Sequence, residues 1–169
     1  MKNYLIIGNP ISHSLSPKIH NYWFKENNID GYYDKISPNE NEIEKIIQKI
    51  KSKEIFGINV TVPFKQSVIP YLETQSEIAI KTNSVNTIFY KNGKIHGDNT
   101  DVYGFEKSVI NNNINLEGKS VFIFGSGGVV PSVITALLNL KINKIFISNR
   151  TIENTKSIKN KFDFVEIVE

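Results

Sequence analysis

Between residues 120 and 140 an apolar strand, a glycine-rich turn and an apolar helix follow one another without a break. The strand is predicted over Ser120–Phe124, the turn over Gly125–Gly128 and the helix over Val129–Leu140. Glycines in such a turn let backbone N–H groups approach a pyrophosphate and direct the helix N-terminus toward it. Because Val130 or Ser132 stands where a third glycine would fall, the turn by itself does not identify a dinucleotide site.

The next predicted strand, Lys144–Ser148, ends in Asn149-Arg150-Thr151. The end of the second strand is where a Rossmann unit contacts the adenosine ribose, and there an acidic residue selects a free 2′-hydroxyl whereas arginine accommodates a 2′-phosphate. Arg150 is the only arginine of the chain, and lysine supplies every other basic position. The pattern therefore favours NADP over NAD.

The preceding residues alternate strands with helices. Strands are predicted over Tyr4–Ile7, Tyr32–Ile36 and Ile55–Val62, with a helix that Ser16 caps and Pro17 starts between the first two. A second helix follows Pro38-Asn39, and its apolar residues recur at helical spacing: Ile43, Ile46, Ile47 and Ile50. Another helical stretch is expected through the seventies. This alternation predicts a parallel-rich α/β sheet.

A polar run of residues, 111–115, follows the helix expected after Asp101 and is typical of a linker. We therefore expect two domains. Residues 1–111 form an α/β substrate domain, and residues 116–169 form the first half of a Rossmann dinucleotide-binding domain.

Polar side chains gather three times just after an apolar strand. Residues 9–17 follow the first strand and carry hydroxyls and an imidazole; residues 59–65 read Asn-Val-Thr-Val-Pro-Phe-Lys; and residues 97–101 hold two carboxylates. Loops at strand ends are common ligand-binding positions. A small-molecule site is therefore expected at these strand ends.

Lys65 is the candidate for proton transfer. Pro63 suits the first turn of a helix, so we expect Lys65 to lie near a helix N-terminus, where the helix dipole disfavours an ammonium ion. Such a lysine can exchange a proton at neutral pH, whereas most lysines are solvated surface charges.

Composition excludes several classes of function. The net charge of +3 and pI near 8.9 are mild, and the lysines form no basic stripe, so nucleic acid is not indicated. The chain has no cysteine, no histidine with a metal partner at useful spacing, and no apolar run long enough for a membrane span. The residue types therefore indicate no metal site. The N-terminus lacks the pattern of a signal peptide, so the cytoplasm is the expected location.

Six segments in order resemble the motifs of shikimate dehydrogenases: residues 9–17, 59–65, 84–87, 97–101, the turn at 125–128, and 149–151. The resemblance covers the whole chain. It implies that the hydroxyls and carboxylate of shikimate are held by Ser14, Ser16, Thr61, Lys65, Asn86 and Asp101, with Lys65 and Asp101 as the catalytic pair. It also implies NADP on Gly125, Ser126, Gly127 and Gly128, with Asn149, Arg150 and Thr151 at the 2′-phosphate.

The implied activity is NADP-dependent interconversion of shikimate and 3-dehydroshikimate in aromatic amino-acid biosynthesis, with a homodimer left open. Family chains continue past a third cofactor-domain strand, here expected at Phe164–Val168, so on this interpretation the chain is an incomplete enzyme. Two alternatives stay open: an NAD-linked quinate/shikimate dehydrogenase, and a truncated shikimate-binding fragment without activity. Local rules also allow Ser16, and Thr100 or Asp101, to serve as helix caps.

Overall fold

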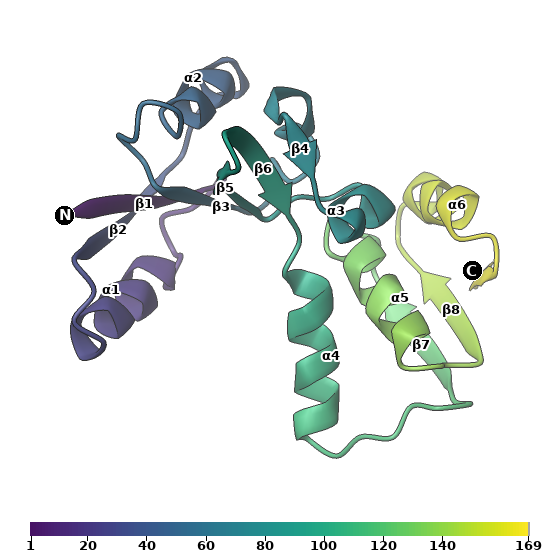
Figure 1. The fold of residues 1–169 in the computed structure, drawn as a ribbon. Coiled ribbons are helices and arrows are strands. Elements are labelled where there is room, and N and C mark those ends of the chain that lie inside the picture. The colour runs from purple at the N-terminus through teal and green to yellow at the C-terminus, as the bar shows by residue number, and fades with distance from the viewer. Residues whose placement is uncertain (169) are drawn as a thin grey trace. The chain divides into compact units, whose positions relative to one another are not determined.

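A computed structural model gives the structure of the chain and describes residues 1–168 (Figure 1). The chain forms two compact units, Met1–Asn99 and Thr100–Glu169. Each unit has its own β-sheet and its own apolar core. No helix among the described residues is long and apolar enough to cross a lipid bilayer.

The first unit is built on a six-stranded sheet in the order β2-β1-β3-β5-β6-β4. Its strands are β1 (Lys2–Ile7), β2 (Gly31–Ile36), β3 (Gly57–Val60), β4 (Thr74–Gln75), β5 (Thr87–Lys91) and β6 (Lys94–Asp98). β1 pairs in parallel with β2 and β3, and β4 pairs in parallel with β6, whereas β5 runs antiparallel to both its neighbours. The predicted parallel-rich α/β sheet is confirmed.

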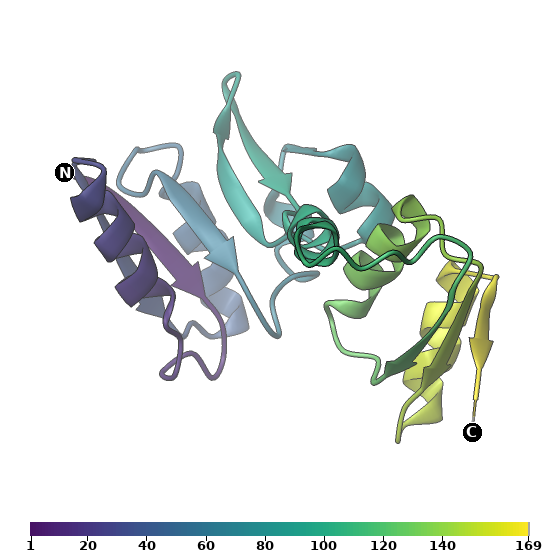
Figure 2. The ribbon, with the colours of Figure 1, turned by 90° about the horizontal axis from the view of Figure 1, so that it is seen from below.

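Helices α1 (Ser16–Glu26) and α2 (Ile43–Gln48) lie on opposite faces of this sheet (Figures 1 and 2). Side chains alternate between the faces of a strand. Leu5 and Ile7 accordingly join the core under α2, and Tyr4 and Ile6 join the smaller cluster under α1.

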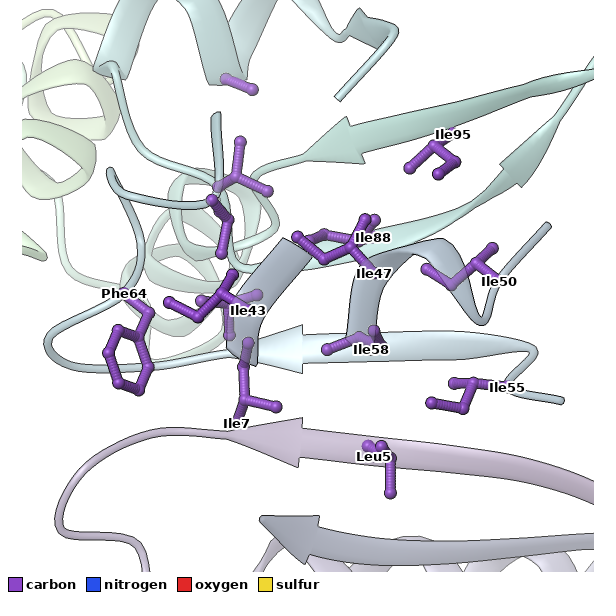
Figure 3. Close-up of a cluster of buried hydrophobic side chains, with 14 residues drawn as sticks. Leu5, Ile7, Ile43, Ile47, Ile50, Ile55, Ile58, Phe64, Ile88 and Ile95 are labelled. Carbon is purple, nitrogen blue, oxygen red and sulfur yellow. The ribbon is translucent and has the colours of Figure 1, made fainter. Parts of the chain in front are cut away.

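The isoleucines after Asn39 form one buried face as predicted, although α2 ends at Gln48, before Ile50. Ile43, Ile47 and Ile50 are fully buried (Figure 3). Ile46 is partly buried and packs against the same core. A short 3₁₀ turn, η1 (Glu40–Glu42), precedes the helix, and the backbone N–H of Asn39 donates to Glu42 Oε2 at 2.8 Å. This bond satisfies one of the donors that a helix start leaves unpaired.

The prediction of a helix beginning at Pro63 is wrong. Residues 62–68 form a series of turns, and regular 3₁₀ structure begins only at η2 (Ile69–Tyr71). The carbonyl of Lys65, which a helix would offer to residue 69, instead accepts a 2.8 Å hydrogen bond from the N–H of Val85. A tertiary contact thus replaces the helical bond, and no helix N-terminus lies at Lys65.

Three further predictions need correction. Ser16 is the first residue of α1 and Leu15 holds the cap position, so Ser16 is not the cap. The stretch through the seventies is η2, then β4, then α3 (Glu77–Thr82), which Ser76 caps by accepting from the N–H of Ala79 at 3.1 Å. The third strand, β3, is shorter than expected, and β6, joined to β5 by a tight turn at Asn92-Gly93, is not anticipated by the sequence pattern.

The second unit contains a parallel sheet in the order β7-β8-β9. Its elements are α4 (Asp101–Asn111), β7 (Ser120–Phe124), α5 (Val130–Asn139), β8 (Lys144–Ser148), α6 (Ile152–Lys161) and β9 (Val165–Ile167). The bounds of β7 and β8 agree with the prediction. This strand–helix–strand–helix–strand order is that of the first half of a Rossmann domain.

One face of this sheet, with Ile145, Ile147 and Val165, packs against α5 and α6. The opposite face carries Phe122 and Phe124, whose rings lie 4.5 Å apart and which are 42% and 86% exposed. The alternation of β7 therefore separates a covered face from an exposed aromatic one.

Helix α4 groups with the second unit because it packs on α5 and contributes Phe105 to the second core. The compact units therefore divide before α4, between Asn99 and Thr100, whereas the sequence suggested a boundary after it, at residue 111. The assignment of residues 1–111 and 116–169 to substrate and cofactor stays a prediction.

Candidate functional site

One edge of the first sheet collects the ends of four strands. Parallel pairing sets Ile7 of β1 beside Val60 of β3, and antiparallel pairing sets Asn59 beside Thr87 at the start of β5. Thr87 in turn pairs with Asp98 at the end of β6. The loops after β1, β3 and β6 and the loop before β5 therefore lie at the same edge of the sheet.

Backbone hydrogen bonds tie the loops after β1 and β3 together at this edge. The N–H of Thr61 donates to the carbonyl of Ile7, and the N–H of Asn9 donates to the carbonyl of Val62, both at 2.9 Å. Gly8 allows this approach, because a Cβ there would lie 2.4 Å from Thr61 Cγ2 and 3.1 Å from the Val62 carbonyl oxygen.

The loop from Gly8 carries the predicted serines into α1. The N–H of Ser14 donates to the carbonyl of Ile11 at 3.0 Å, and Ser14 Oγ accepts a 3.3 Å hydrogen bond from the N–H of Ser16. Lys35 Nζ donates to the carbonyl of Ser12 and links this loop to β2. Both serines are partly buried, as expected for side chains in a formed loop.

Lys65 and Asn86 are joined through the backbone. The bond from Val85 to the Lys65 carbonyl holds the turn at residues 62–68 against the residue that precedes Asn86. Asn86 itself is 9% exposed; its N–H donates to the Asp98 carbonyl at 3.0 Å, and its carbonyl accepts from Val60 at 2.8 Å. Thr61, Lys65 and Asn86 thus belong to one hydrogen-bonded framework.

Tyr33, Asn59 and Thr87 form a second set of polar residues at this edge, and the sequence assigned no role to any of the three. Tyr33 Oη donates to Asn59 Oδ1 at 2.7 Å, and Asn59 Nδ2 donates to Thr87 Oγ1 at 3.2 Å and to the Asn86 carbonyl at 3.3 Å. Thr87 Oγ1 donates to Asn86 Oδ1 at 2.9 Å. Asn59, between two apolar residues of a predicted strand, was the one sequence feature that could have indicated this set. A buried side-chain amide needs hydrogen-bond partners, so polar neighbours could have been expected around it.

A cavity of about 340 Å³ lies on the α1 side of the same sheet. Aromatic side chains form much of its wall: Tyr4, Phe24, Phe56 and Phe89. His20, Tyr33, Asn59 and Thr87 also line it. Burial lowers the pKa of His20 and raises the pKa of Tyr33, so both side chains are neutral at pH 7.

Asp98, one of the two carboxylates noted in the sequence, has a structural role. Its Oδ1 accepts from Ser76 Oγ at 2.6 Å and from the N–H of Asn99 at 2.7 Å. Asn99 Nδ2 donates to Thr82 Oγ1 and to the Ser84 carbonyl. These bonds hold the end of β6 against α3.

Asp101 is the first residue of α4 in the second unit and is partly buried. Thr100 occupies the cap position of this helix without a side-chain cap hydrogen bond. Lys65 lies in the first unit, so the pairing of Lys65 with Asp101 stays a prediction. No group of three or more histidine, aspartate or glutamate side chains in residues 1–168 is arranged to hold a metal ion.

The glycine turn lies at the carboxyl end of β7. Gly125 has φ of +105°, a conformation that favours glycine, and its N–H donates to the Ser148 carbonyl at 2.8 Å. A Cβ on Gly127 or Gly128 would meet no atom within 4 Å, so the backbone is accessible from outside. Helix α5 begins directly behind, with Pro131 in its first turn.

The second predicted cofactor segment lies beside the first, because Phe124 at the end of β7 pairs with Ser148 at the end of β8. Asn149 Nδ2 donates to the Thr151 carbonyl at 2.9 Å and shapes the turn into α6. Arg150 between them is exposed. The turn at 125–128 and residues 149–151 therefore share one end of the parallel sheet.

Two family models match the chain. The shikimate dehydrogenase substrate binding domain matches residues 6–88, and shikimate / quinate 5-dehydrogenase matches residues 107–169. The chain belongs to the shikimate dehydrogenase family. Its resemblance to that family, inferred from six short motifs, is confirmed.

Individual relatives agree with the family models. A shikimate dehydrogenase (NADP(+)) of Pelagibacter ubique is 47% identical over 167 residues, which cover 99% of this chain and 63% of the relative. The crystal structure of shikimate dehydrogenase from Aquifex aeolicus superposes with a TM-score of 0.92 at 36% identity, over 100% of this chain and 63% of that one.

Thermus thermophilus shikimate 5-dehydrogenase in complex with NADP(H) and shikimate superposes with a TM-score of 0.88 at 25% identity, over 100% of this chain and 63% of that one. The chain therefore spans a little under two thirds of the length of these relatives.

Proposed function

We propose that this chain supplies the shikimate-binding domain and the first half of the NADP-binding domain of an oxidoreductase that interconverts shikimate and 3-dehydroshikimate. The reaction belongs to the biosynthesis of chorismate and the aromatic amino acids. The observation that supports this most is the sheet edge where backbone bonds hold the loops after β1 and β3 against the start of β5. The relatives named above carry this activity in their names.

The substrate is a small ring with several hydroxyls and a carboxylate, and the proposed site offers matching groups. Hydroxyls come from Ser14, Ser16 and Thr61, a carboxamide from Asn86, and an amino group from Lys65. Partly buried hydroxyl and amide groups discriminate strongly between polar ligands, because a wrong ligand leaves them unpaired.

Lys65 is the proposed proton-transfer group. It accepts the proton of the reacting substrate hydroxyl in one direction and returns it to the ketone oxygen in the other. Asp101 is proposed to orient the Lys65 side-chain amine and one substrate hydroxyl. No metal takes part in this scheme.

The residues of the second unit fit an NADP cofactor. Gly127 and Gly128 present backbone that no side chain covers, at the start of the ten-residue helix α5, as a pyrophosphate site requires. Ser126 and Gly125 complete the turn, and Asn149, Arg150 and Thr151 would contact the 2′-phosphate. When bound, NADP would accept a hydride from the carbinol carbon of the substrate.

Two alternatives remain. An NAD-linked quinate/shikimate dehydrogenase would share the substrate site, but exposed Arg150 at the end of β8 favours a cofactor with a 2′-phosphate. A shikimate-binding fragment without activity would keep the first unit's site and lack turnover. The cytoplasmic location and a homodimer stay predictions from the sequence.

An activity assay of a chimaeric enzyme tests the proposal. The 169-residue chain alone should not oxidise shikimate with NADP, because it spans 63% of the relative's length and a dinucleotide fold needs two halves. A chimaera in which this chain replaces the matched part of the Pelagibacter ubique enzyme should produce reduced nicotinamide, followed by its absorbance. A folded but inactive chimaera, beside an active Pelagibacter parent, would contradict the proposed function.

A further inference from the structure

A continuous chain of hydrogen bonds runs across three strands to the carboxamide of Asn86. It begins at Tyr33 on β2, passes through Asn59 on β3 and ends through Thr87 on β5. None of these three residues is among the six that the family resemblance implies hold shikimate. Each bond lies between 2.7 and 3.3 Å.

The main-chain carbonyl of Asn86 fixes the orientation of the Asn59 carboxamide in this chain. A carbonyl only accepts, so the atom of Asn59 that faces it at 3.3 Å must be the amino nitrogen Nδ2. The other end of the Asn59 carboxamide is then Oδ1, and it must accept from Tyr33 Oη. The ambiguity between O and N that usually attends an amide is therefore removed by chemistry.

Thr87 transmits this orientation. Its Oγ1 accepts from Asn59 Nδ2, so its own hydroxyl proton is available to donate to Asn86 Oδ1 at 2.9 Å. Since Oδ1 of Asn86 accepts from Thr87, the amino group Nδ2 is the end of that carboxamide turned away from Thr87. The bond from Thr87 therefore puts a hydrogen-bond donor, Nδ2, at the other end of the Asn86 carboxamide.

Tyr33 is itself held in place as the first donor. Its N–H donates to Asn21 Oδ1 at 2.9 Å and its carbonyl accepts from Asn21 Nδ2 at 2.8 Å. The His20 ring stacks on the phenol at 4.2 Å with the planes 3° apart. Tyr33 is 3% exposed, and burial raises the pKa of its hydroxyl, which therefore keeps its proton at physiological pH.

We propose that Tyr33, Asn59 and Thr87 are positioning residues that present the amino group of Asn86 to the substrate as a donor. The Asn86 amino group then favours a substrate that places a hydrogen-bond-accepting oxygen opposite it, such as a hydroxyl, ketone or carboxylate oxygen. This inference rests on the proposed role of Asn86 in shikimate binding.

The test combines a shikimate titration with nuclear magnetic resonance of side-chain amides in the ¹⁵N-labelled chain. Thr87→Val removes the hydroxyl and keeps the strand-forming shape, whereas Thr87→Ser keeps the hydroxyl. Thr87→Val should shift the Asn86 side-chain NH₂ signals and weaken shikimate binding about three- to tenfold, the effect of one hydrogen bond. Thr87→Ser should stay near the parent in both measurements.

Tyr33→Phe should move the same signals in the same direction by a smaller amount, because the Asn86 carbonyl still orients Asn59. Tyr90→Phe, on an exposed tyrosine of β5, is the matched control. If Thr87→Val left the Asn86 signals in place, or Thr87→Ser were as damaging as Thr87→Val, the positioning role would be wrong.

Asn86→Asp tests the donor itself and identifies the signals, since it removes that NH₂ pair. A carboxylate still accepts from Thr87 but offers the substrate an acceptor in place of a donor, so shikimate binding should fall more than tenfold; unchanged binding would overturn the inference. If the parent chain bound no shikimate, the proposed substrate site would fail, while the amide signals would still decide the orientation of Asn86.

Discussion

The N–H of Val85 donates a 2.8 Å hydrogen bond to the carbonyl of Lys65. The stretch after Pro63 forms turns instead of a helix, and this bond holds Lys65 beside the segment that carries Asn86. The proposed proton-transfer group is therefore placed by tertiary structure, and the helix-dipole explanation of its chemistry does not apply.

Lys65→Ala should reduce turnover far more than shikimate affinity. A general acid–base group acts mainly in the transition state and contributes about 10² to 10⁴ in rate. Steady-state kinetics of the Pelagibacter chimaera, with shikimate binding measured separately, gives both quantities. Lys81→Ala, on an exposed lysine of α3, is the control and should match the parent. Turnover of Lys65→Ala within a few-fold of the parent would remove Lys65 from the mechanism.

Arg150→Ala should weaken NADP much more than NAD. Only NADP has a 2′-phosphate for the guanidinium, and a hydrogen bond to a charged group contributes about 1.5–3 kcal/mol, or roughly ten- to a hundredfold in affinity. Titration of both cofactors into parent and variant measures the difference. Lys156→Ala, on an exposed lysine of α6, should change neither affinity. Equal losses for NADP and NAD would show that Arg150 is structural.

Gly8→Ala should destabilise the first unit by about 1–3 kcal/mol, the usual cost of overpacking. The new Cβ would lie 2.4 Å from Thr61 Cγ2 and close to backbone that cannot move freely. Gly104→Ala in α4 meets no neighbour within 4 Å and should stabilise its helix by about 0.5–1 kcal/mol. Urea unfolding compares the two substitutions, and a Gly8→Ala chain as stable as the parent would contradict the close approach of the two loops.

The buried hydroxyl of Tyr33 should make the free energy of unfolding fall at alkaline pH. Burial raises the folded pKa of Tyr33 above its unfolded value near 10, so its neutral form is favoured in the folded state. Below about pH 10 this group adds no pH dependence; above it the unfolded chain loses its proton first, and the free energy of unfolding falls as pH rises. His20, stacked on the ring, is already neutral in this range.

Unfolding curves collected across this range should therefore show a shallower alkaline loss for Tyr33→Phe than for the parent. Tyr90→Phe, on an exposed ring, serves as the control and should follow the parent curve. Identical slopes for Tyr33→Phe and the parent would mean that Tyr33 is solvated in the folded protein.

The sequence predicted most reliably the elements whose pattern is local. β7 and β8 are apolar runs bounded by turn residues, and the isoleucine stripe of α2 needs only helical periodicity. β6 escaped prediction because Ile95 is the one strongly apolar residue among residues 94–98, and its strand structure depends on pairing with β5 and β4.

The site was harder to predict than the fold because it depends on register. Asn59 meets Thr87 only through the pairing of β3 with β5, which are far apart in the sequence. The bond from Val85 to Lys65 has the same origin. The local sequence proposed Lys65, and the family resemblance implied Thr61 and Asn86, but neither revealed the bonds that hold them.

Titration of the ¹⁵N-labelled 169-residue chain with shikimate tests the central claim most directly. Binding should be weak, and the shifted backbone amides should cluster at the loop of Ser14 and Ser16, at Thr61, at Lys65 and at Asn86. Quinate and an unrelated hydroxy acid give the comparison for specificity. Shifts confined to other parts of the chain, or no shifts at saturating shikimate, would contradict the account.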